Sequence, residues 1–130
     1  MLRIGNVVMG VSDVRRASEF WRQALGYVPR DGELQPGDDN IILVPPDGVG
    51  IGLDLDTSET PVQKHPRGHL DLDTDSVTEQ AAEVERLVSL GAERVDWDLY
   101  PEDPDFIVLA DTEGNRFCVV DKSHGIGGAE

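Results

Sequence analysis

Apolar and polar positions along the first half of the chain predict a strand, a helix and three further strands. Residues 4–11, IGNVVMGV, are mostly apolar and rich in β-branched side chains, which favours a strand. A helix is expected next, because apolar residues recur at helical spacing between a capping Ser12 or Asp13 and the helix-ending Gly26. The apolar stripe of this helix comprises Val14, Ala17, Phe20, Trp21, Ala24 and Leu25. Turn-rich stretches then separate predicted strands at about 27–33, 40–45 and 50–56.

The second half repeats this order of elements. HLDLDT predicts a strand at 69–74, Asp75 or Ser76 caps a helix from about 77 to 90, and Gly91 closes it. Asn6–Val14 aligns with His69–Val77, and the helix ends align as well. Three more strands are expected, at about 92–99, 105–110 and 116–121.

The repeat predicts an α+β fold of two βαβββ modules in one chain, forming cupped mixed sheets with the helices on their outer faces. The expected organisation is a single domain, with module one at about 3–56, a polar linker at about 57–66, module two at about 67–121 and a tail at 122–130.

Side chains alternate across a strand, so His69, Asp71 and Asp73 share one face of the second module while Leu70 and Leu72 share the other. The leucine face is expected to pack on the helix. The polar face then points into a cleft or into water.

Composition narrows the function classes. The 11 basic and 26 acidic residues give a net charge of -15, which opposes binding to nucleic acid or to an anionic membrane. A single cysteine cannot form an internal disulfide, which favours a reducing compartment. The first residues lack the pattern of a signal peptide, and no apolar run is long enough for a membrane span. A cytoplasmic location is therefore expected.

Three stretches together resemble the vicinal oxygen chelate superfamily, which includes glyoxalase I, extradiol dioxygenases, fosfomycin-resistance enzymes and bleomycin-binding proteins. They are VVMGVSDVRRASEFWRQALGY, HLDLDTDS with LGAERVDW, and FIVLADTEGNRFCVV, and the resemblance extends from residue 3 to about 121. The second half is most similar to the glyoxalase-like group, although Thr112 replaces the proline of the common Asp-Pro-Glu-Gly-Asn turn.

The resemblance implies a divalent metal held by residues of the first and last strand of each module. By position these ligands fall on Asn6 and His69 for the first strands, and on Cys118 and a residue near Gly52, with Asp54 two residues on, for the last strands. His69 alone is a standard match, so it is the metal-ligand candidate, and the expected ligand set is incomplete.

The sequence leaves several roles open. His69 is either a metal ligand or a cleft histidine bonded to a carboxylate, and Cys118 is a ligand, a nucleophile beside His69 or a small apolar filler. Trp97, predicted on a strand, lines a pocket or covers a sheet edge. The expected ligand-binding residues are Asn6, Val8, Asp54, His69, Asp71, Trp97 and Cys118.

We therefore expect a glyoxalase-like protein that binds a small molecule in a cupped sheet. The alternative is a metal-dependent lyase, isomerase or dioxygenase acting on a substrate with vicinal oxygens. The resemblance also implies a homodimer. A small-molecule ligand is the expected partner, and neither nucleic acid nor membrane is expected.

Overall fold

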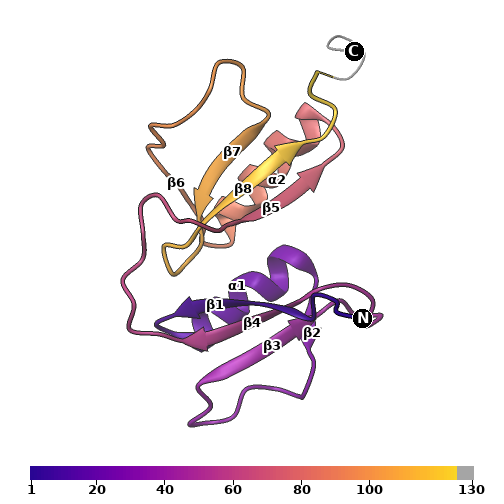
Figure 1. Cartoon of the computed structure of the whole chain (residues 1–130), viewed down its shortest axis with the longest axis vertical. Helices are drawn as coiled ribbons and strands as arrows, with labels where there is room; N and C mark the ends of the chain where they lie inside the picture. The colour runs from indigo at the N-terminus through magenta and orange to yellow at the C-terminus, as the bar shows by residue number, and fades with distance from the viewer. Residues whose placement is uncertain (126–130) are drawn as a thin grey trace. The chain divides into compact units, whose positions relative to one another are not determined.

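The computed structural model describes residues 1–125 as two compact units, the first spanning Met1–Pro61 and the second starting at Val62. Each unit contains one four-stranded mixed sheet and one helix, in the same order (Figure 1). The predicted α+β fold of two βαβββ modules is thus confirmed. Residues 126–130 of the predicted tail lie outside the described residues. Neither helix within residues 1–125 is long and apolar enough to cross a membrane.

The first unit has the sheet order β1-β4-β3-β2, with β1 parallel to β4 and the other pairs antiparallel. Its elements are β1 (Asn6–Val11), α1 (Val14–Leu25), β2 (Val28–Pro29), β3 (Asn40–Val44) and β4 (Gly52–Thr57). Helix α1 packs on β3 and β4. Phe20 and Trp21 of α1 are fully buried with Leu43, Leu53 and Leu55 of these strands, so the helix stripe predicted from the sequence forms the core.

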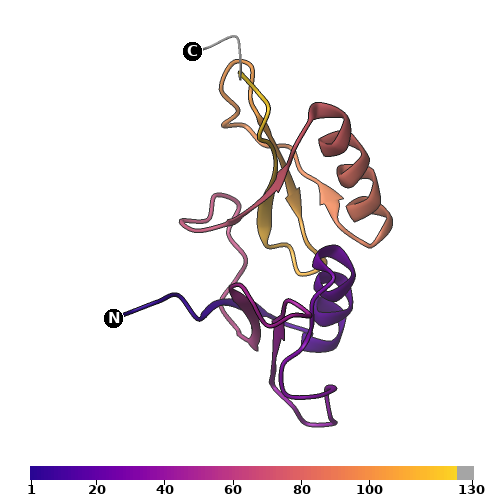
Figure 2. The same cartoon turned by 90° about the vertical axis from the view of Figure 1, so that its right-hand side faces the viewer.

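The second unit repeats this arrangement with the order β5-β8-β7-β6, in which β5 is parallel to β8. Its elements are β5 (Leu70–Thr74), α2 (Val77–Ser89), β6 (Glu93–Arg94), β7 (Phe106–Ala110) and β8 (Arg116–Asp121). Figure 2 shows α2 against one face of this sheet. The core between the helix and the sheet contains Val84, Leu87, Leu109, Phe117 and Val119. The opposite face of the sheet is not covered by α2.

The helix ends resolve the capping alternatives. Asp13 caps α1 and accepts a hydrogen bond from the Arg16 backbone N–H at 3.0 Å, and Ser76 caps α2 in the same way through Glu79. Helix α2 ends in a Schellman motif, because the Ala92 N–H donates to the Leu87 carbonyl and the Gly91 N–H donates to the Val88 carbonyl.

Replacing Gly91 by Val should lower the free energy of unfolding by about 1–2 kcal/mol, because φ at this position is +120° and side chains strain the backbone there. A Cβ would also lie 2.9 Å from Thr112 Cγ2. Urea unfolding followed by circular dichroism measures the loss. Adding Thr112→Ser removes the clashing methyl and should restore part of the stability. An unchanged unfolding midpoint in Gly91→Val would contradict the motif.

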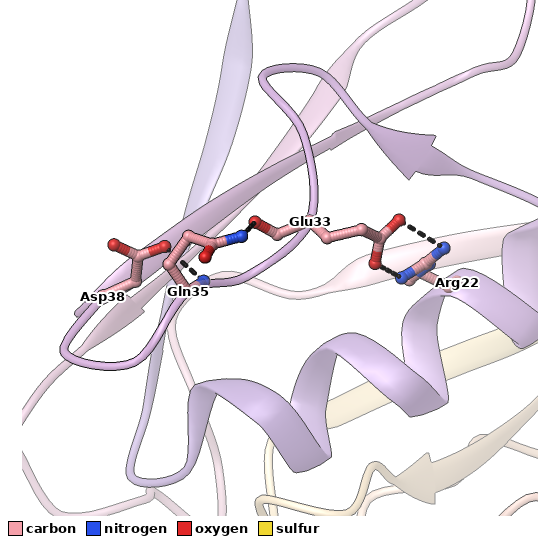
Figure 3. Close-up of polar contacts among 4 residues, drawn as sticks. All are labelled: Arg22, Glu33, Gln35 and Asp38. Atoms are coloured by element: carbon pink, nitrogen blue, oxygen red, sulfur yellow. Dashed lines mark hydrogen bonds and ion pairs between the residues drawn. The ribbon is translucent and has the colours of Figure 1, made fainter.

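Two predicted strands are shorter than expected. The strand predicted at 27–33 is confined to Val28–Pro29. One further backbone bond, from the Arg30 N–H to the Ile42 carbonyl at 2.8 Å, precedes the loop. The following loop is held instead by side chains (Figure 3): Arg22 of α1 forms a bidentate ion pair with Glu33, at 2.8 and 3.3 Å, and Gln35 donates to the Glu33 carbonyl.

The strand predicted at 92–99 is confined to Glu93–Arg94, at the edge of the sheet. The segment that follows, VDWDLYPEDPD, is rich in aspartate and proline, which disfavour strand pairing. Trp97 therefore lies in irregular structure after β6, and the prediction that it lies on a strand is wrong. His69 likewise precedes β5 by one residue.

Candidate functional site

A cavity of about 380 Å³ lies in the second unit, on the face of the sheet that does not carry the core. Strands β5, β7 and β8 form its floor, and the segment after β6 and the start of the second unit supply its walls. It is lined by Pro66, His69, Asp71, Trp97, Leu99, Asp105, Phe106, Val108, Arg116, Cys118 and Val120.

Strand register explains why these side chains meet. Cys118 of β8 is paired with Asp71 of β5 on one side and with Val108 of β7 on the other, so the three lie in a row across the sheet. Alternation along β8 then places Arg116 and Val120 on the same face as Cys118. Their neighbours Phe117 and Val119 point into the core, as their full burial shows.

Three polar groups cluster at the centre of this face. The Nε2 atom of His69 lies 3.0 Å from a carboxylate oxygen of Asp71. The Cys118 sulfur completes the group, and one ligand atom from each of the three side chains lies within 4.8 Å of the others. Cys118 is buried at the base of the cluster, whereas His69 and Asp71 are exposed. The contact between His69 and Asp71 is the one expected of a cleft histidine that is hydrogen-bonded to a carboxylate.

The pKa of the Cys118 thiol is raised from 9.0 to about 11. Burial is the largest cause, followed by repulsion from the Asp71 charge, a hydrogen bond to Asp71 that favours the protonated thiol, and repulsion from Asp105. Asp71 stands between the thiol and the imidazole in this bonding pattern. The arrangement therefore disfavours a thiolate at neutral pH and opposes a Cys–His nucleophile, which needs the base next to the sulfur.

Alkylation of Cys118 by iodoacetamide should be slow at pH 8 and should rise with a midpoint near pH 11, because only the thiolate reacts. Since Cys118 is the chain's one cysteine, mass spectrometry of the intact protein reports the rate without ambiguity. Asp71→Asn should lower the midpoint toward 9.0, and Asp105→Asn should lower it less, in the order of their contributions. Equal midpoints in all three proteins would show that Asp71 does not hold the thiol protonated.

Trp97 is held beside the cavity by a second histidine–aspartate pair. His65 Nε2 lies 2.7 Å from an oxygen of Asp98, and the imidazole meets the Trp97 indole edge-on at 5.1 Å between ring centres. The hydrogen bond with His65 lowers the pKa of Asp98. The pair ties the segment before β5 to the segment after β6. Trp97 thus lines a pocket, one of the two roles left open by the sequence.

The remaining expected site residues lie together in the first unit. Asn6 is paired with Gly52, and Val8 is paired with Asp54, so all four positions share one face of the first sheet. The Asn6 carboxamide lies over Gly52, where a Cβ would come 2.2 Å from its oxygen, and Asn40 donates to Asp54 at 3.0 Å.

The register corrects one positional match. Val8 aligns with Asp71 in the internal repeat, so Asp54, paired with Val8, corresponds to Cys118, paired with Asp71. Gly52 instead corresponds to Arg116, two residues earlier. The first module therefore carries Asn6, Val8 and Asp54 where the second carries His69, Asp71 and Cys118. In the first set, Asp54 offers a carboxylate and Asn6 a neutral carboxamide oxygen, whereas Val8 offers no ligand atom.

Sequence reasoning missed most of the apolar wall and the one arginine among the lining residues, Arg116. A signal was present. Once Cys118 is assigned to the polar face, period-two alternation assigns Arg116 and Val120 to it as well, and the paired strand contributes Phe106 and Val108. Pro66 and Leu99 come from irregular segments, and strand periodicity offers no signal for them.

His69, Asp71 and Cys118 fit a divalent metal by their chemistry. Imidazole nitrogen, carboxylate oxygen and thiolate sulfur are the ligand types of Zn²⁺, and three protein ligands with one open position are typical of catalytic zinc. A nitrogen and an oxygen on one tetrahedral ion lie about 3.3 Å apart, close to the 3.0 Å between His69 and Asp71. The same separation suits a direct hydrogen bond.

Comparison with known proteins agrees with the fold. The profile of the glyoxalase-like domain family matches residues 6–120. No curated protein matches the chain. Among solved structures, a glyoxalase-related enzyme from Fulvimarina pelagi is 17% identical with a TM-score of 0.67, over 94% of this chain and 89% of that one. A family enzyme of the glyoxalase/bleomycin resistance protein/dioxygenase type from Burkholderia phytofirmans PsJN is 15% identical with a TM-score of 0.68, over 90% and 96%.

A third similar structure is a variant of the fosfomycin resistance protein FosX from Listeria monocytogenes, complexed with Mn(II) and 1S,2S-dihydroxypropylphosphonic acid. It is 14% identical with a TM-score of 0.69, over 100% of this chain and 99% of that one. At these identities the structural likeness shows the fold alone, whereas the family profile covers most of the sequence. The chain therefore belongs to the glyoxalase-like domain family.

Proposed function

We propose that the protein binds a small organic molecule in the cavity of its second module. The observation that supports this most directly is the cavity itself, whose volume of about 380 Å³ falls in the range of small-molecule sites. It combines an apolar wall with a few convergent polar groups, which is the composition such sites share.

The two kinds of lining are separated along the strands. Phe106 and Val120 are paired at one end of the sheet, and Trp97 and Leu99 add apolar surface from the segment after β6. His69, Asp71 and Cys118 lie at the centre. A ligand with a planar or aliphatic body would gain apolar contact on the wall and hydrogen bonds from the polar cluster, which would fix its orientation.

A titration with neutral aromatic probes tests the proposal. Phenol and benzyl alcohol should produce saturable shifts of the Trp97 indole N–H resonance in a Trp21→Phe protein, in which Trp97 is the one remaining indole. Val120→Phe adds a ring inside the cavity and should abolish the shifts, whereas Val49→Phe, at an exposed site of the first unit, should not. If neither neutral nor charged probes shift the resonance, the cavity is not a ligand site.

A second candidate function is a metal-dependent lyase, isomerase or dioxygenase. The observation that favours it is the close grouping of His69, Asp71 and Cys118, which present three donors of different type within 4.8 Å. A bound divalent ion would stabilise negative charge that develops on a ligand oxygen. The FosX variant of similar fold was solved with Mn(II), which supports considering this role here.

If the protein is such a metal-dependent enzyme, the residues around the cluster have roles of their own. The apolar wall excludes water and orients the ligand. Burial, followed by the Asp71 charge, keeps the Cys118 thiol protonated when no cation is near, so that binding of an ion releases a proton. The retained proton makes affinity depend on pH, with tighter binding as pH rises.

His69→Ala should lower the affinity for Zn²⁺ by more than about 100-fold, because loss of even an outer-shell partner costs 10- to 100-fold. Isothermal titration calorimetry with Zn²⁺, together with the metal content of protein purified without chelator, measures this. His65→Ala is the matched control, since His65 also pairs with an aspartate in the same unit but lies outside the cluster. Wild-type Zn²⁺ affinity in His69→Ala would remove the metal-dependent reading.

We also infer that two chains associate and that the protein works in the cytoplasm, both on the strength of the sequence and its resemblance. Sedimentation velocity at micromolar concentration tests the association. A sedimentation coefficient that stays at the value for one 14.2 kDa chain across the concentration range would contradict a homodimer.

A further inference from the structure

We propose, building on the small-molecule site above, that the cavity selects an organic oxyanion. The ligand would pair a carboxylate or similar anionic oxygen group with Arg116 and lay an apolar body against Phe106 and Trp97. The proposal rests on the bonding of Arg116, on the order of side chains along β8, and on how the acidic groups of the cavity are already engaged.

Arg116 is a cation with unused donors inside the cavity. Its Nη1 atom donates to the Gly114 carbonyl at 2.8 Å, which fixes the guanidinium, while its Nε atom is buried without a hydrogen-bond partner among residues 1–125. A guanidinium has five N–H donors in a rigid fork that matches the two oxygens of a carboxylate. The Nη2 donors have no partner among residues 1–125, so they are the ones that would pair with a ligand oxygen in the cavity.

The acidic residues of the cavity do not replace such a ligand. Asp71 already accepts a hydrogen bond from His69 and interacts with the Cys118 thiol, so its charge is engaged within the cluster. Asp105 is exposed at the far end of the floor, next to Phe106, where water screens it. Neither carboxylate forms an ion pair with Arg116.

The order of side chains along β8 sets the shape of the ligand. Arg116, Cys118 and Val120 share one face at spacings of about 6–7 Å, so the cavity floor runs about 13 Å from a cationic end to an apolar end. Phe106 is paired with Val120 at the apolar end, and Ala110 is paired with Arg116 at the other. A molecule with an oxyanion at one end and an apolar group at the other matches this polarity.

The net charge of the chain makes anion binding a specific test of the cavity. At -15, the protein repels anions from its surface in general. Affinity for an anion must then come from a local contact, and among the cavity's lining residues Arg116 is the permanent cation. Weak adsorption of anions elsewhere on the surface is disfavoured, so a measured preference for an anion reports on the cavity.

Three probes with the same body and different heads test the proposal: 4-phenylbutyrate, 4-phenylbutanamide and 4-phenylbutylamine, titrated at pH 7 while the Trp97 indole resonance is followed. The acid should bind about 10- to 100-fold more tightly than the amide, as expected for a charge-assisted hydrogen bond. Arg116→Gln should abolish this preference, because its neutral side chain forms no charge-assisted hydrogen bond with the acid. Arg116→Lys, which keeps the charge but not the fork, should retain part of it.

Arg94→Gln is the matched control, because Arg94 lies in the same unit but is paired with Glu85 outside the cavity. It should preserve the preference for the acid. Equal binding of acid and amide by the wild-type protein, or an unchanged preference in both Arg116 variants, would overturn the oxyanion proposal while leaving a small-molecule site intact. Tightest binding of the amine, if Val120→Phe abolishes it and so places it in the cavity, would overturn it in favour of the aspartates. Absence of binding by all three probes would instead overturn the proposed small-molecule function.

Discussion

Trp21→Ala should lower the free energy of unfolding by about 3–5 kcal/mol, the cost of removing a large aromatic side chain from a packed core. Trp21 is fully buried between α1 and the first sheet, and its ring meets Phe20 edge-on at 5.0 Å between ring centres. Few surrounding groups can move in to fill the space, because Leu43 and Leu55 are themselves fixed in strands. Urea unfolding followed by far-ultraviolet circular dichroism measures the change.

The second tryptophan is the control. Trp97 is half-buried beside the cavity, outside any helix or strand, so Trp97→Ala should cost about 1 kcal/mol or less and should instead weaken ligand binding. The two indoles also lie in different units, which allows each unit's unfolding to be followed in the variant that lacks the other indole. Equal losses of stability in Trp21→Ala and Trp97→Ala would contradict this division of roles.

The fold was predictable because its elements follow periodic patterns. Helical spacing of Phe20 and Trp21 reflects the buried face of α1, and alternation in β5 separates half-buried leucines from exposed aspartates. Gly26 and Gly91 mark helix ends because both adopt positive φ, at +70° and +120°. These signals are local, so a single sequence contains them in full.

The edge strands and the cavity wall were less predictable, because they depend on contacts between distant segments. Alternating polarity alone does not show that β2 spans only Val28–Pro29, or that Trp97 leaves the sheet after β6 and packs against His65. The pKa of Cys118 is a similar case. Its increase requires both burial and the neighbouring charge of Asp71. These two residues are 47 positions apart in the sequence, and the pairing of β5 with β8 brings them together.

The two modules share a fold but not a site. Strand pairing places Asn6, Val8 and Asp54 in the first module at the positions of His69, Asp71 and Cys118 in the second. The position of Arg116 is taken by Gly52, which has no side chain and is covered by the Asn6 carboxamide. At these matched positions imidazole, thiol and guanidinium occur in the second module alone, which is why we assign both the ligand cavity and the candidate metal donors to it.

Gln80 of α2 links the helix to the floor of that cavity, and nothing in the sequence distinguished it. Its side chain is buried, and its amide nitrogen donates to the Val119 carbonyl at 2.9 Å and to the Asp105 carbonyl at 3.1 Å. Val119 lies between Cys118 and Val120, and Asp105 precedes Phe106, so these two bonds hold strand segments that line the cavity. Two acceptors facing one donor group define a site that tolerates an amide but not a carboxylate.

Gln80→Glu should therefore destabilise the protein by about 3–4 kcal/mol at pH 7, and the loss should shrink as pH falls. A buried carboxylate facing two carbonyl oxygens has a raised pKa, because only the protonated acid can donate a hydrogen bond there. The folded protein then keeps a proton that the unfolded chain releases near pH 4.3, so the variant's deficit relative to wild type grows by about 1.4 kcal/mol per pH unit above that value, until pH passes the raised pKa. Urea unfolding of both proteins from pH 4 to pH 8 measures the difference at each pH.

Gln80→Met removes the same hydrogen bonds at similar volume and should cost about 1–3 kcal/mol with no pH dependence relative to wild type. A Gln80→Glu deficit that stays constant across this range would show that the carboxylate reaches water, and that Gln80 does not anchor the cavity floor as the two bonds indicate.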